Sequence, residues 1–322
     1  MFDFEVHRGG RDARPENTLY SYLYALEIGA VTIECDMQLA KDGIVMSHNP
    51  WLNPDITTDS EGQPVEEGQY DLRTMTVEEI RQFNVGHLRP GTKYAREHGT
   101  QVPHDACIPT LEELFSLIEA AGNRTIEFNI ETKSYPNPES PYYRNNADPE
   151  RFVHEFYRIA RKRHMERRVI LQSFDWTTLI LMKRLDPSIR TSALYQQQPS
   201  WGVDGDTLWL GRKDPSPWLG GIRLSDCGGS VIEAAHKAGA DILSPYYREI
   251  GAADVKHAHS LSMKVVSWTI NEKEDMEREL DKGVDGIISD RPALLRQVLT
   301  ARGIPLPDKQ PCPNSPYHLE GQ

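Results

Sequence analysis

Short apolar runs rich in β-branched residues alternate with amphipathic, helix-like stretches through most of the chain. This alternation is typical of parallel βα units, in which each strand is followed by a helix that covers the sheet. The apolar runs predict eight strands, at Phe4–His7, Val31–Met37, Thr125–Glu131, Val169–Ser173, Arg190–Leu194, Ala240–Ser244, Lys264–Thr269 and Asp285–Ser289. Eight such strands favour a closed (β/α)8 barrel of the TIM type.

The helical stretches are clearest in the second half of the chain. Gly239 and Gly283 directly follow two of them, as a left-handed C-cap requires. A doubly wound open sheet has the same local pattern, but no Gly-x-Gly-x-x-Gly follows a strand here to mark a nucleotide-binding crevice. The barrel is therefore preferred. The predicted helices are Ser230–Ala238, Ala252–Leu261, Glu272–Lys282 and Pro292–Thr300.

Two stretches depart from this alternation of predicted strands and helices. The segment from Asn49 to Ile108 is rich in Pro, Gly, Asp and Glu and predicts an inserted subdomain with one short helix at Val77–Phe83. The segment from Gln196 to Gly221 carries three tryptophans and is either a lid or a packed excursion. We predict one (β/α)8 domain over residues 1–304, with the insertion at 49–108, and a loosely ordered tail over residues 305–322.

Composition narrows the class of protein. The 322 residues are 38% hydrophobic and 26% charged, which is typical of a globular chain. The formal net charge is −12 and no basic stripe occurs, which disfavours nucleic acid and anionic membranes as partners. No apolar run reaches 18 residues, so no transmembrane segment is expected. The start of the sequence is not a signal peptide, which indicates the cytoplasm, although a mature periplasmic or secreted protein would look the same. The oligomeric state stays open.

Three carboxylates mark a candidate metal site. Glu34 and Asp36 stand two apart in a predicted strand, so they project to the same side with Cα atoms roughly 6 to 7 Å apart. Glu131 ends the next predicted strand. Carboxylates without cysteine ligands suit one hard divalent cation, Mg²⁺ or Ca²⁺ with Mn²⁺ possible, rather than zinc. The alternative for the pair alone is a solvent-facing position on an edge strand.

Two histidines and two basic residues surround these carboxylates. His7 ends the first strand and His48 follows a hairpin-like turn, so both can reach the same end of the barrel as an acid/base pair. Arg8 and Lys133 offer a planar fork and a point charge for a phosphate group. Arg8 can also pair with Glu16, and that carboxylate would then hold the guanidinium in place.

In order along the chain, the motifs resemble those of glycerophosphodiester phosphodiesterases. They run from residue 7 to residue 292, nearly the whole sequence. They are His7-Arg8-Gly9, Pro15-Glu16-Asn17-Thr18, Glu34-x-Asp36, Lys41-Asp42-Gly43, His48, Glu131-x-Lys133, Gln172-Ser173-Phe174, Trp268-Thr269-Ile270-Asn271 and Gly286-Ile287-Ile288-Ser289-Asp290-Arg291-Pro292.

The resemblance implies a metal-dependent enzyme that hydrolyses glycerophosphodiesters to sn-glycerol 3-phosphate and an alcohol. It implies that Phe174 and Trp268 line the glycerol or alcohol side of the site. The other implied roles agree with those above, with metal binding by Glu34, Asp36 and Glu131, acid/base chemistry by His7 and His48, and phosphate binding by Arg8 and Lys133.

One departure concerns the second histidine. Family members usually have His-Asp here, whereas this chain has His48-Asn49. The asparagine removes a carboxylate but can still accept a hydrogen bond from the ring.

The family's chemistry leaves two alternatives open. The same site could act as a lysophospholipase D on lysophospholipids, with the segment Trp201 to Trp218 as the candidate wall for an acyl chain. A non-catalytic binding barrel is the other alternative, and it is disfavoured because every expected position is filled. The nucleophile is either water or the substrate's own glycerol hydroxyl, which gives a cyclic phosphate, and we favour the hydroxyl for a glycerol substrate.

Overall fold

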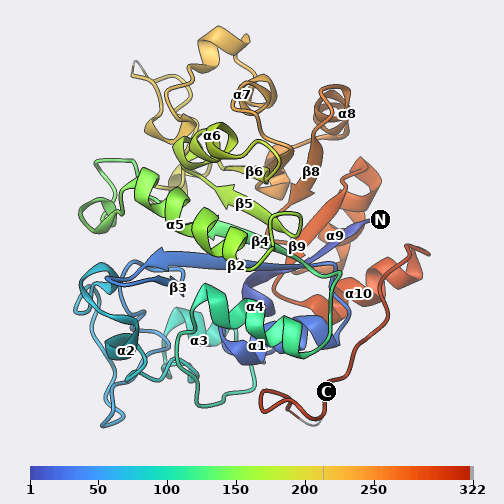
Figure 1. Cartoon of the computed structure of the whole chain (residues 1–322). Helices are drawn as coiled ribbons and strands as arrows, with labels where there is room; N and C mark the ends of the chain where they lie inside the picture. Colours follow the sequence, from blue (N-terminus) through green and yellow to red (C-terminus); the bar gives the residue numbers. More distant parts are fainter. Residues whose placement is uncertain (213, 320–322) are drawn as a thin grey trace. The chain divides into compact units, whose positions relative to one another are not determined.

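The computed structural model describes residues 1–212 and 214–319. Its strand order is β1-β9-β8-β7-β6-β5-β4-β2-β3, and β1 pairs additionally with β2. The eight predicted strands correspond to β1, β2 and β4 to β9, so the predicted TIM-type (β/α)8 fold is confirmed (Figure 1). Contacts between residues divide the chain into two units, residues 1–128 with 289–322 and residues 129–288. The prediction of one domain over residues 1–304 stays a prediction.

The first unit contains the parallel pair β1 and β2, in which Glu5 lies opposite Thr32. An additional strand, β3, pairs antiparallel with β2, with Leu39 opposite Ile44. The sequence pattern did not predict β3 because this strand has only three residues. The elements of this unit are β1 (Asp3–Val6), η1 (His7–Gly9), α1 (Leu19–Glu27), β2 (Thr32–Leu39), β3 (Ile44–Met46), η2 (Leu72–Thr74), α2 (Val77–Ile80), α3 (Lys93–Glu97), α4 (Leu111–Ala120) and α10 (Pro292–Ala301).

The segment after β3 buries apolar side chains in a cluster that also includes Ala40 and Val45. This explains why a stretch with little regular structure is ordered, since burial of apolar surface offsets the loss of chain entropy. The predicted helix at Val77–Phe83 is observed as the shorter α2, which ends at Ile80, whereas α3 was not predicted. The buried cluster comprises Ala40, Val45, Leu52, Ile56, Val65, Leu72, Ile80, Phe83, Val85 and Ile108.

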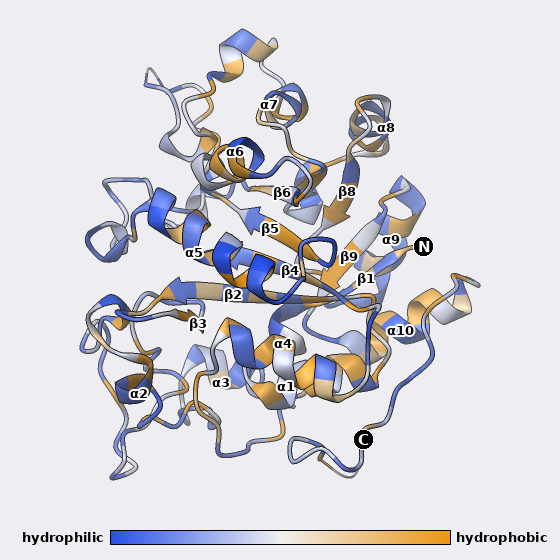
Figure 2. Cartoon of the chain, in the orientation of Figure 1, coloured by the Kyte–Doolittle hydropathy of each residue, from blue (hydrophilic) through white to orange (hydrophobic). Residues whose placement is uncertain are grey.

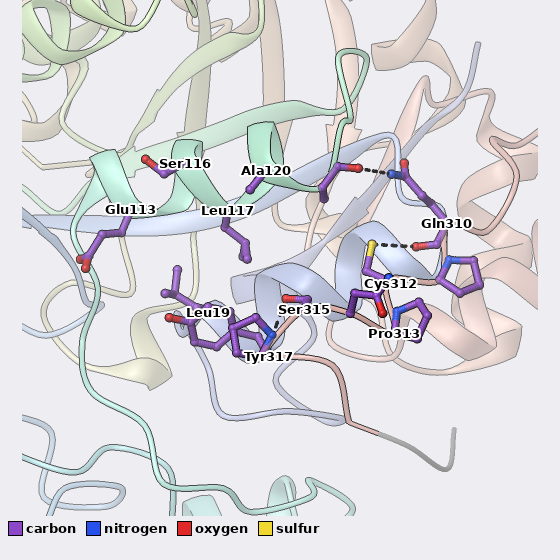
Figure 3. A pocket seen from close by; sticks show the side chains of 14 residues that line it. Leu19, Glu113, Ser116, Leu117, Ala120, Gln310, Cys312, Pro313, Ser315 and Tyr317 are labelled. Carbon is purple, nitrogen blue, oxygen red and sulfur yellow. Dashed lines mark hydrogen bonds between the residues drawn. The ribbon is translucent and has the colours of Figure 1, made fainter.

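The C-terminal segment packs against α1 and α4 in the same unit. Gln310 donates from its backbone N–H to the Glu27 carbonyl and from Nε2 to the Ala121 carbonyl, and His318 Nδ1 lies 2.5 Å from a Glu27 oxygen. A cavity of 580 Å³ opens between this segment and the two helices (Figure 3). None of the predicted site residues lines this cavity.

The second unit is a succession of βα units. Its strands pair in parallel from β5 to β9, with Ile170 opposite Arg190 and Leu243 opposite Val265. The predicted helices of this half correspond to α7, α8 and α9, and α10 of the first unit is the fourth. The elements are β4 (Glu127–Thr132), which begins at the boundary, η3 (Tyr143–Asn145), α5 (Pro149–Lys162), β5 (Val169–Ser173), α6 (Trp176–Leu185), β6 (Arg190–Tyr195), η4 (Pro199–Trp201), η5 (Pro217–Leu219), η6 (Leu224–Cys227), α7 (Val231–Lys237), β7 (Ile242–Pro245), η7 (Tyr247–Glu249), α8 (Ala252–Ser260), β8 (Lys264–Ser267), α9 (Lys273–Lys282) and β9 (Gly286–Ser289).

Hydropathy follows the expected division between core and surface in this unit. Four buried aliphatic side chains from four strands, Ile170, Ile242, Val266 and Ile288, pack together. Figure 2 shows β9 in the hydrophobic colour and both colours along α5, which has one buried and one exposed face. Among the described residues, every helix is too short or too polar to cross a lipid bilayer.

Candidate active site

His7 directly follows β1, and its ring is fixed by a residue from the other end of the chain. His7 Nδ1 lies 2.6 Å from Oδ1 of Asp290, which directly follows β9. Arg11 also binds Asp290, with Nε 2.6 Å from Oδ1 and Nη2 3.2 Å from Oδ2. Both His7 and Asp290 are almost fully enclosed, with side chains 13% and 1% exposed.

Charge and burial set the protonation of this pair. Burial alone would raise the pKa of Asp290, but the positive charge of Arg11 and the hydrogen bond from His7 hold that pKa well below its usual range. Burial lowers the pKa of His7, against the opposing effect of Asp290. An ionised Asp290 only accepts hydrogen bonds, so Nδ1 of a neutral His7 carries the proton and Nε2 carries the lone pair. His7 Nε2 lies 3.8 Å from Oε2 of Glu34.

Arg8 is buried and held by two carboxylates. Its Nη1 donates to both oxygens of Glu16, at 3.1 Å each, and its Nε lies 3.1 Å from Oδ2 of Asp36. The predicted pairing with Glu16 is thus confirmed. Arg8 has a positive φ of 51°, and its backbone N–H donates to Glu34 Oε2 at 2.9 Å. The turn continues through Gly9, where a Cβ would come within 2.7 Å of the Ser21 backbone, so this close approach to α1 requires glycine.

Glu34 and Asp36 lie on β2 and are each about 1% exposed. Asn17 binds Asp36 twice, because its Nδ2 donates to Oδ2 at 3.0 Å and its Oδ1 accepts from the Asp36 backbone N–H at 3.2 Å. The Tyr22 hydroxyl donates to the same Asn17 oxygen at 3.0 Å. These bonds compensate part of the cost of burying a carboxylate.

His48 follows β3, and its Nδ1 lies 2.8 Å from Oδ1 of Asn49. The hydrogen bond expected from this asparagine is therefore present. The His48 carbonyl also accepts from Gln38 Nε2 at 3.3 Å.

In the second unit, Glu131 is the penultimate residue of β4, and Lys133 directly follows the strand. Both are 6% exposed, and Lys133 Nζ lies 2.8 Å from Glu131 Oε1. Lys133 Nζ also lies 5.9 Å from the ring centre of Phe174, which follows β5. The Phe174 ring contacts Trp268 edge to face, with 5.5 Å between ring centres. The predicted residues Lys133, Phe174 and Trp268 are therefore brought together within this unit.

The insertion contacts the loop that carries Arg11 and Glu16. From α3, the Tyr94 hydroxyl donates to Glu16 Oε2, the carboxylate that also holds Arg8. His98, directly after α3, binds Asp12, and Gln101 Nε2 donates to the Arg11 carbonyl at 2.8 Å. The insertion therefore supports the loop after η1 from outside the strands.

Sequence reasoning assigned no role to four residues that the structure places around the site. Asp290 could have been found, because it directly follows the last predicted strand, much as His7 ends the first predicted strand. Asn17 lies in a quoted motif but has no charge to mark it. Arg11 and Tyr94 carry no local signal, since their partners are distant in sequence.

Two sets of side chains carry donor atoms that suit a cation. Glu34 and Asp36 in the first unit and Glu131 in the second unit are buried carboxylates, and an all-oxygen donor set suits a hard cation. Asp12, His98 and Asp290 form a second group, but Arg291 Nε lies 2.8 Å from Asp12 and Arg11 binds Asp290. Guanidinium groups thus lie against both of these carboxylates.

Comparisons with known proteins agree with this geometry. Residues 7–294 match the profile of the Glycerophosphoryl diester phosphodiesterase family. The glycerophosphodiester phosphodiesterase of Caldanaerobacter subterraneus is 31% identical over 303 residues, which cover 92% of this chain and 98% of that protein. The crystal structure of a candidate glycerophosphoryl diester phosphodiesterase from Silicibacter pomeroyi has a TM-score of 0.79 and 29% identity, with 94% of each chain covered. An Oleispira antarctica phosphodiesterase in complex with its product sn-glycerol-3-phosphate has a TM-score of 0.62, 20% identity, and 92% and 96% coverage, and therefore shares the fold.

Proposed function

Because the chain belongs to the glycerophosphoryl diester phosphodiesterase family, we propose that it hydrolyses glycerophosphodiesters to sn-glycerol 3-phosphate and an alcohol with one bound divalent cation. The family and the enzyme class that its motifs predicted are both confirmed. A small-molecule phosphodiester as substrate agrees with the product bound to the Oleispira antarctica protein.

The single observation that carries this proposal is the His7–Asp290 pair. A neutral imidazole whose Nδ1–H is taken by a carboxylate presents Nε2 as a base, and this atom lies beside Glu34. His48, whose Nδ1 is bound by Asn49, is proposed as the partner acid. A binding protein would have no need to orient an imidazole in this way.

We assign metal binding to Glu34, Asp36 and Glu131. The cation is Mg²⁺ or Ca²⁺, with Mn²⁺ as a third candidate, because all three donors are carboxylates. When bound, such a cation polarises the phosphate oxygens and stabilises negative charge.

We assign phosphate binding to Arg8 and Lys133. Two carboxylates fix Arg8 through Nε and Nη1, and no hydrogen bond among the described residues uses its Nη2, which is left for a phosphate oxygen. Lys133 adds a buried positive charge next to Phe174, which with Trp268 is assigned to the glycerol or alcohol side.

The reaction breaks the bond between phosphorus and the alcohol oxygen. One histidine takes the proton of the nucleophile as that oxygen attacks phosphorus, and the other gives a proton to the leaving alkoxide. We favour the glycerol hydroxyl as nucleophile, so that a cyclic phosphate forms first and water opens it in a second step. Attack by water would give glycerol 3-phosphate directly.

The test is release of glycerol 3-phosphate from glycerophosphocholine, glycerophosphoethanolamine and glycerophosphoglycerol, and of lysophosphatidic acid from lysophosphatidylcholine, each with Mg²⁺ or Ca²⁺ and with a chelator. We expect turnover of the glycerophosphodiesters that the chelator abolishes. No turnover of any substrate with metal present would contradict the proposed enzymatic function. Release of lysophosphatidic acid from lysophosphatidylcholine alone would instead identify a lysophospholipase D. Observation of a cyclic phosphate by ³¹P NMR would establish the hydroxyl route.

A further inference from the structure

A continuous run of aromatic rings leads away from Lys133 in the second unit. Phe174 contacts Trp268, Trp268 contacts Tyr246 at 5.7 Å between ring centres, and Tyr246 contacts Trp201 at 4.8 Å. These four rings come from the ends of β5, β7 and β8 and from η4, and we call them the aromatic run. It is longer than one glycerol requires and it begins at the proposed phosphate contact.

The aromatic run is fixed in place yet open to solvent. Trp268 Nε1 donates to the Ser244 carbonyl at 3.0 Å, which holds the indole plane. Tyr246 and Trp268 are linked by a backbone bridge and are both half-buried, while Trp201 is 52% exposed. Rings that are rigid before binding lose little entropy when a ligand contacts them.

A carboxylate from η7 binds the loop that carries Trp201. Glu249 Oε1 accepts from the Gln197 N–H at 2.7 Å and from Gln198 Nε2 at 2.8 Å, which ties the loop carrying Trp201 to η7. Oε2 of the same carboxylate is buried and has no hydrogen-bond partner among the described residues. A carboxylate thus lies three positions after Tyr246 in the sequence, and it is bonded to the two glutamines that precede η4.

Other aromatic faces of this unit already carry cations. Arg212 lies 4.3 Å from the ring centre of Trp209, and Arg248 lies 5.3 Å from that of Tyr247. In the part of the chain that the structure describes, no lysine or arginine stacks on Trp201, Tyr246 or Trp268. Among the described residues, these three rings therefore carry no cation of the chain itself.

We propose that the aromatic run binds the quaternary ammonium group of a choline leaving alcohol, which makes a choline-bearing glycerophosphodiester the preferred substrate. A trimethylammonium group donates no hydrogen bonds and is attracted to aromatic faces, so it exchanges water for rings at little cost. This group is two carbons from the ester oxygen, and we assign it to the rings that follow Phe174, which are Trp268 and Tyr246, with Trp201 beyond them. The inference rests on the proposed function, since hydrolysis breaks the phosphorus–oxygen bond and choline leaves as the alcohol.

The same headgroup occurs in a diester without fatty acids and in lysophosphatidylcholine. Glu249, Gln197 and Gln198 form a polar, hydrogen-bonded cluster beside Trp201 in the sequence. We therefore assign it to glycerophosphocholine and not to the lysolipid.

The experiment compares kcat/KM for glycerophosphocholine and glycerophosphoglycerol, two substrates that differ in the charge of the alcohol. We expect Tyr246→Leu to lower the ratio of the two values about tenfold, and Tyr246→Phe, which keeps the ring, to restore it. Glu249→Gln keeps an acceptor for Gln197 and Gln198 but removes the charge, and we expect it to lower the same ratio. Trp209→Leu is the matched control, because its ring already carries Arg212, and it leaves the ratio unchanged.

A binding measurement separates this inference from the proposed function. We expect tetramethylammonium chloride to quench tryptophan fluorescence of the wild type more than NaCl at equal ionic strength, and Tyr246→Leu to remove the difference. If the enzyme hydrolyses glycerophosphoglycerol but Tyr246→Leu leaves the ratio of the two kcat/KM values unchanged, the inference is overturned. The proposed function then stays intact. Faster turnover of lysophosphatidylcholine than of glycerophosphocholine would overturn the assignment to the deacylated diester. No turnover of any substrate would overturn the proposed function, while the fluorescence result would still decide whether the run binds a quaternary ammonium ion.

Discussion

Asp290 binds His7 across 283 positions of the sequence, with its Oδ1 2.6 Å from Nδ1 of the ring. The two residues follow the last and the first strands, β9 and β1. A carboxylate in this position selects one tautomer of the imidazole and fixes the direction of its other nitrogen. The base proposed for the reaction therefore depends on both ends of the sequence.

The first prediction concerns Asp290→Asn. The variant side chain is isosteric but uncharged, so the His7 ring loses its preferred tautomer, and we expect kcat to fall about 100-fold or more. Metal affinity, measured by calorimetric titration with Mg²⁺ or Ca²⁺, should change little because Asp290 is not an assigned ligand. Asp175→Asn is a suitable control, because Asp175 is also a buried aspartate but caps α6. An unchanged kcat for Asp290→Asn would show that His7 needs no orienting carboxylate.

The second prediction separates metal binding from acid/base chemistry. Glu34→Gln keeps the size of the side chain but removes the charge that attracts a cation, so we expect weaker metal binding and loss of most of the activity. His7→Ala should abolish turnover and leave metal binding largely intact. Calorimetry with the metal alone measures the first effect and product release the second. The reverse pattern would exchange the proposed roles.

The third prediction tests the support that the insertion gives to Arg8. Tyr94→Phe removes only the hydroxyl that donates to Glu16, and a hydrogen bond to a buried charge contributes about 1.5 kcal/mol or more. We expect kcat/KM to fall about tenfold, mainly through a higher KM, because the phosphate contact is less well held. Tyr143→Phe, at an exposed tyrosine on η3, is the control. An equal loss in both variants would indicate a general effect of removing a hydroxyl.

The fourth prediction concerns the pH dependence of stability without metal. The pKa of Asp290 is lower in the folded state than the unfolded value of about 3.9. Its charge therefore stabilises the fold above that unfolded value, and this stability is lost as the pH falls toward the folded pKa. We expect Asp290→Asn to lower the free energy of unfolding more at pH 6 than at pH 3, as measured by urea titration.

We expect the opposite pH dependence of stability for Asp175. Burial raises its pKa above the usual value, despite hydrogen bonds from Ser134 and Thr177. Its ionisation therefore destabilises the folded state as the pH rises past the pKa that Asp175 has in the unfolded state. Protonation at low pH removes this cost. Asp175→Asn should cost less stability at pH 6 than at pH 3. The same pH trend in both variants would contradict the assigned charges.

Much of the architecture is predictable from local pattern, because the β-branched runs and the helix periodicity repeat in every βα unit. The strand β3 is not predictable in this way, because the three residues Ile44–Met46 are too few to show a periodicity. The carboxylates Glu34 and Asp36 are predictable as a pair because side chains two apart in a strand point the same way. Tyr94 and Asp290 act through partners that are 78 and 283 positions away, and no local rule connects them.

The contacts of α3 have a consequence for protein engineering. Tyr94 and His98 lie in the insertion, whereas Glu16 and Asp12, which they bind, lie in the loop after η1. An insertion transplanted from a relative to alter substrate choice would therefore arrive without the donors that this loop requires. Such a graft would have to include the loop as well, so the smallest exchangeable module comprises two discontinuous pieces of the chain.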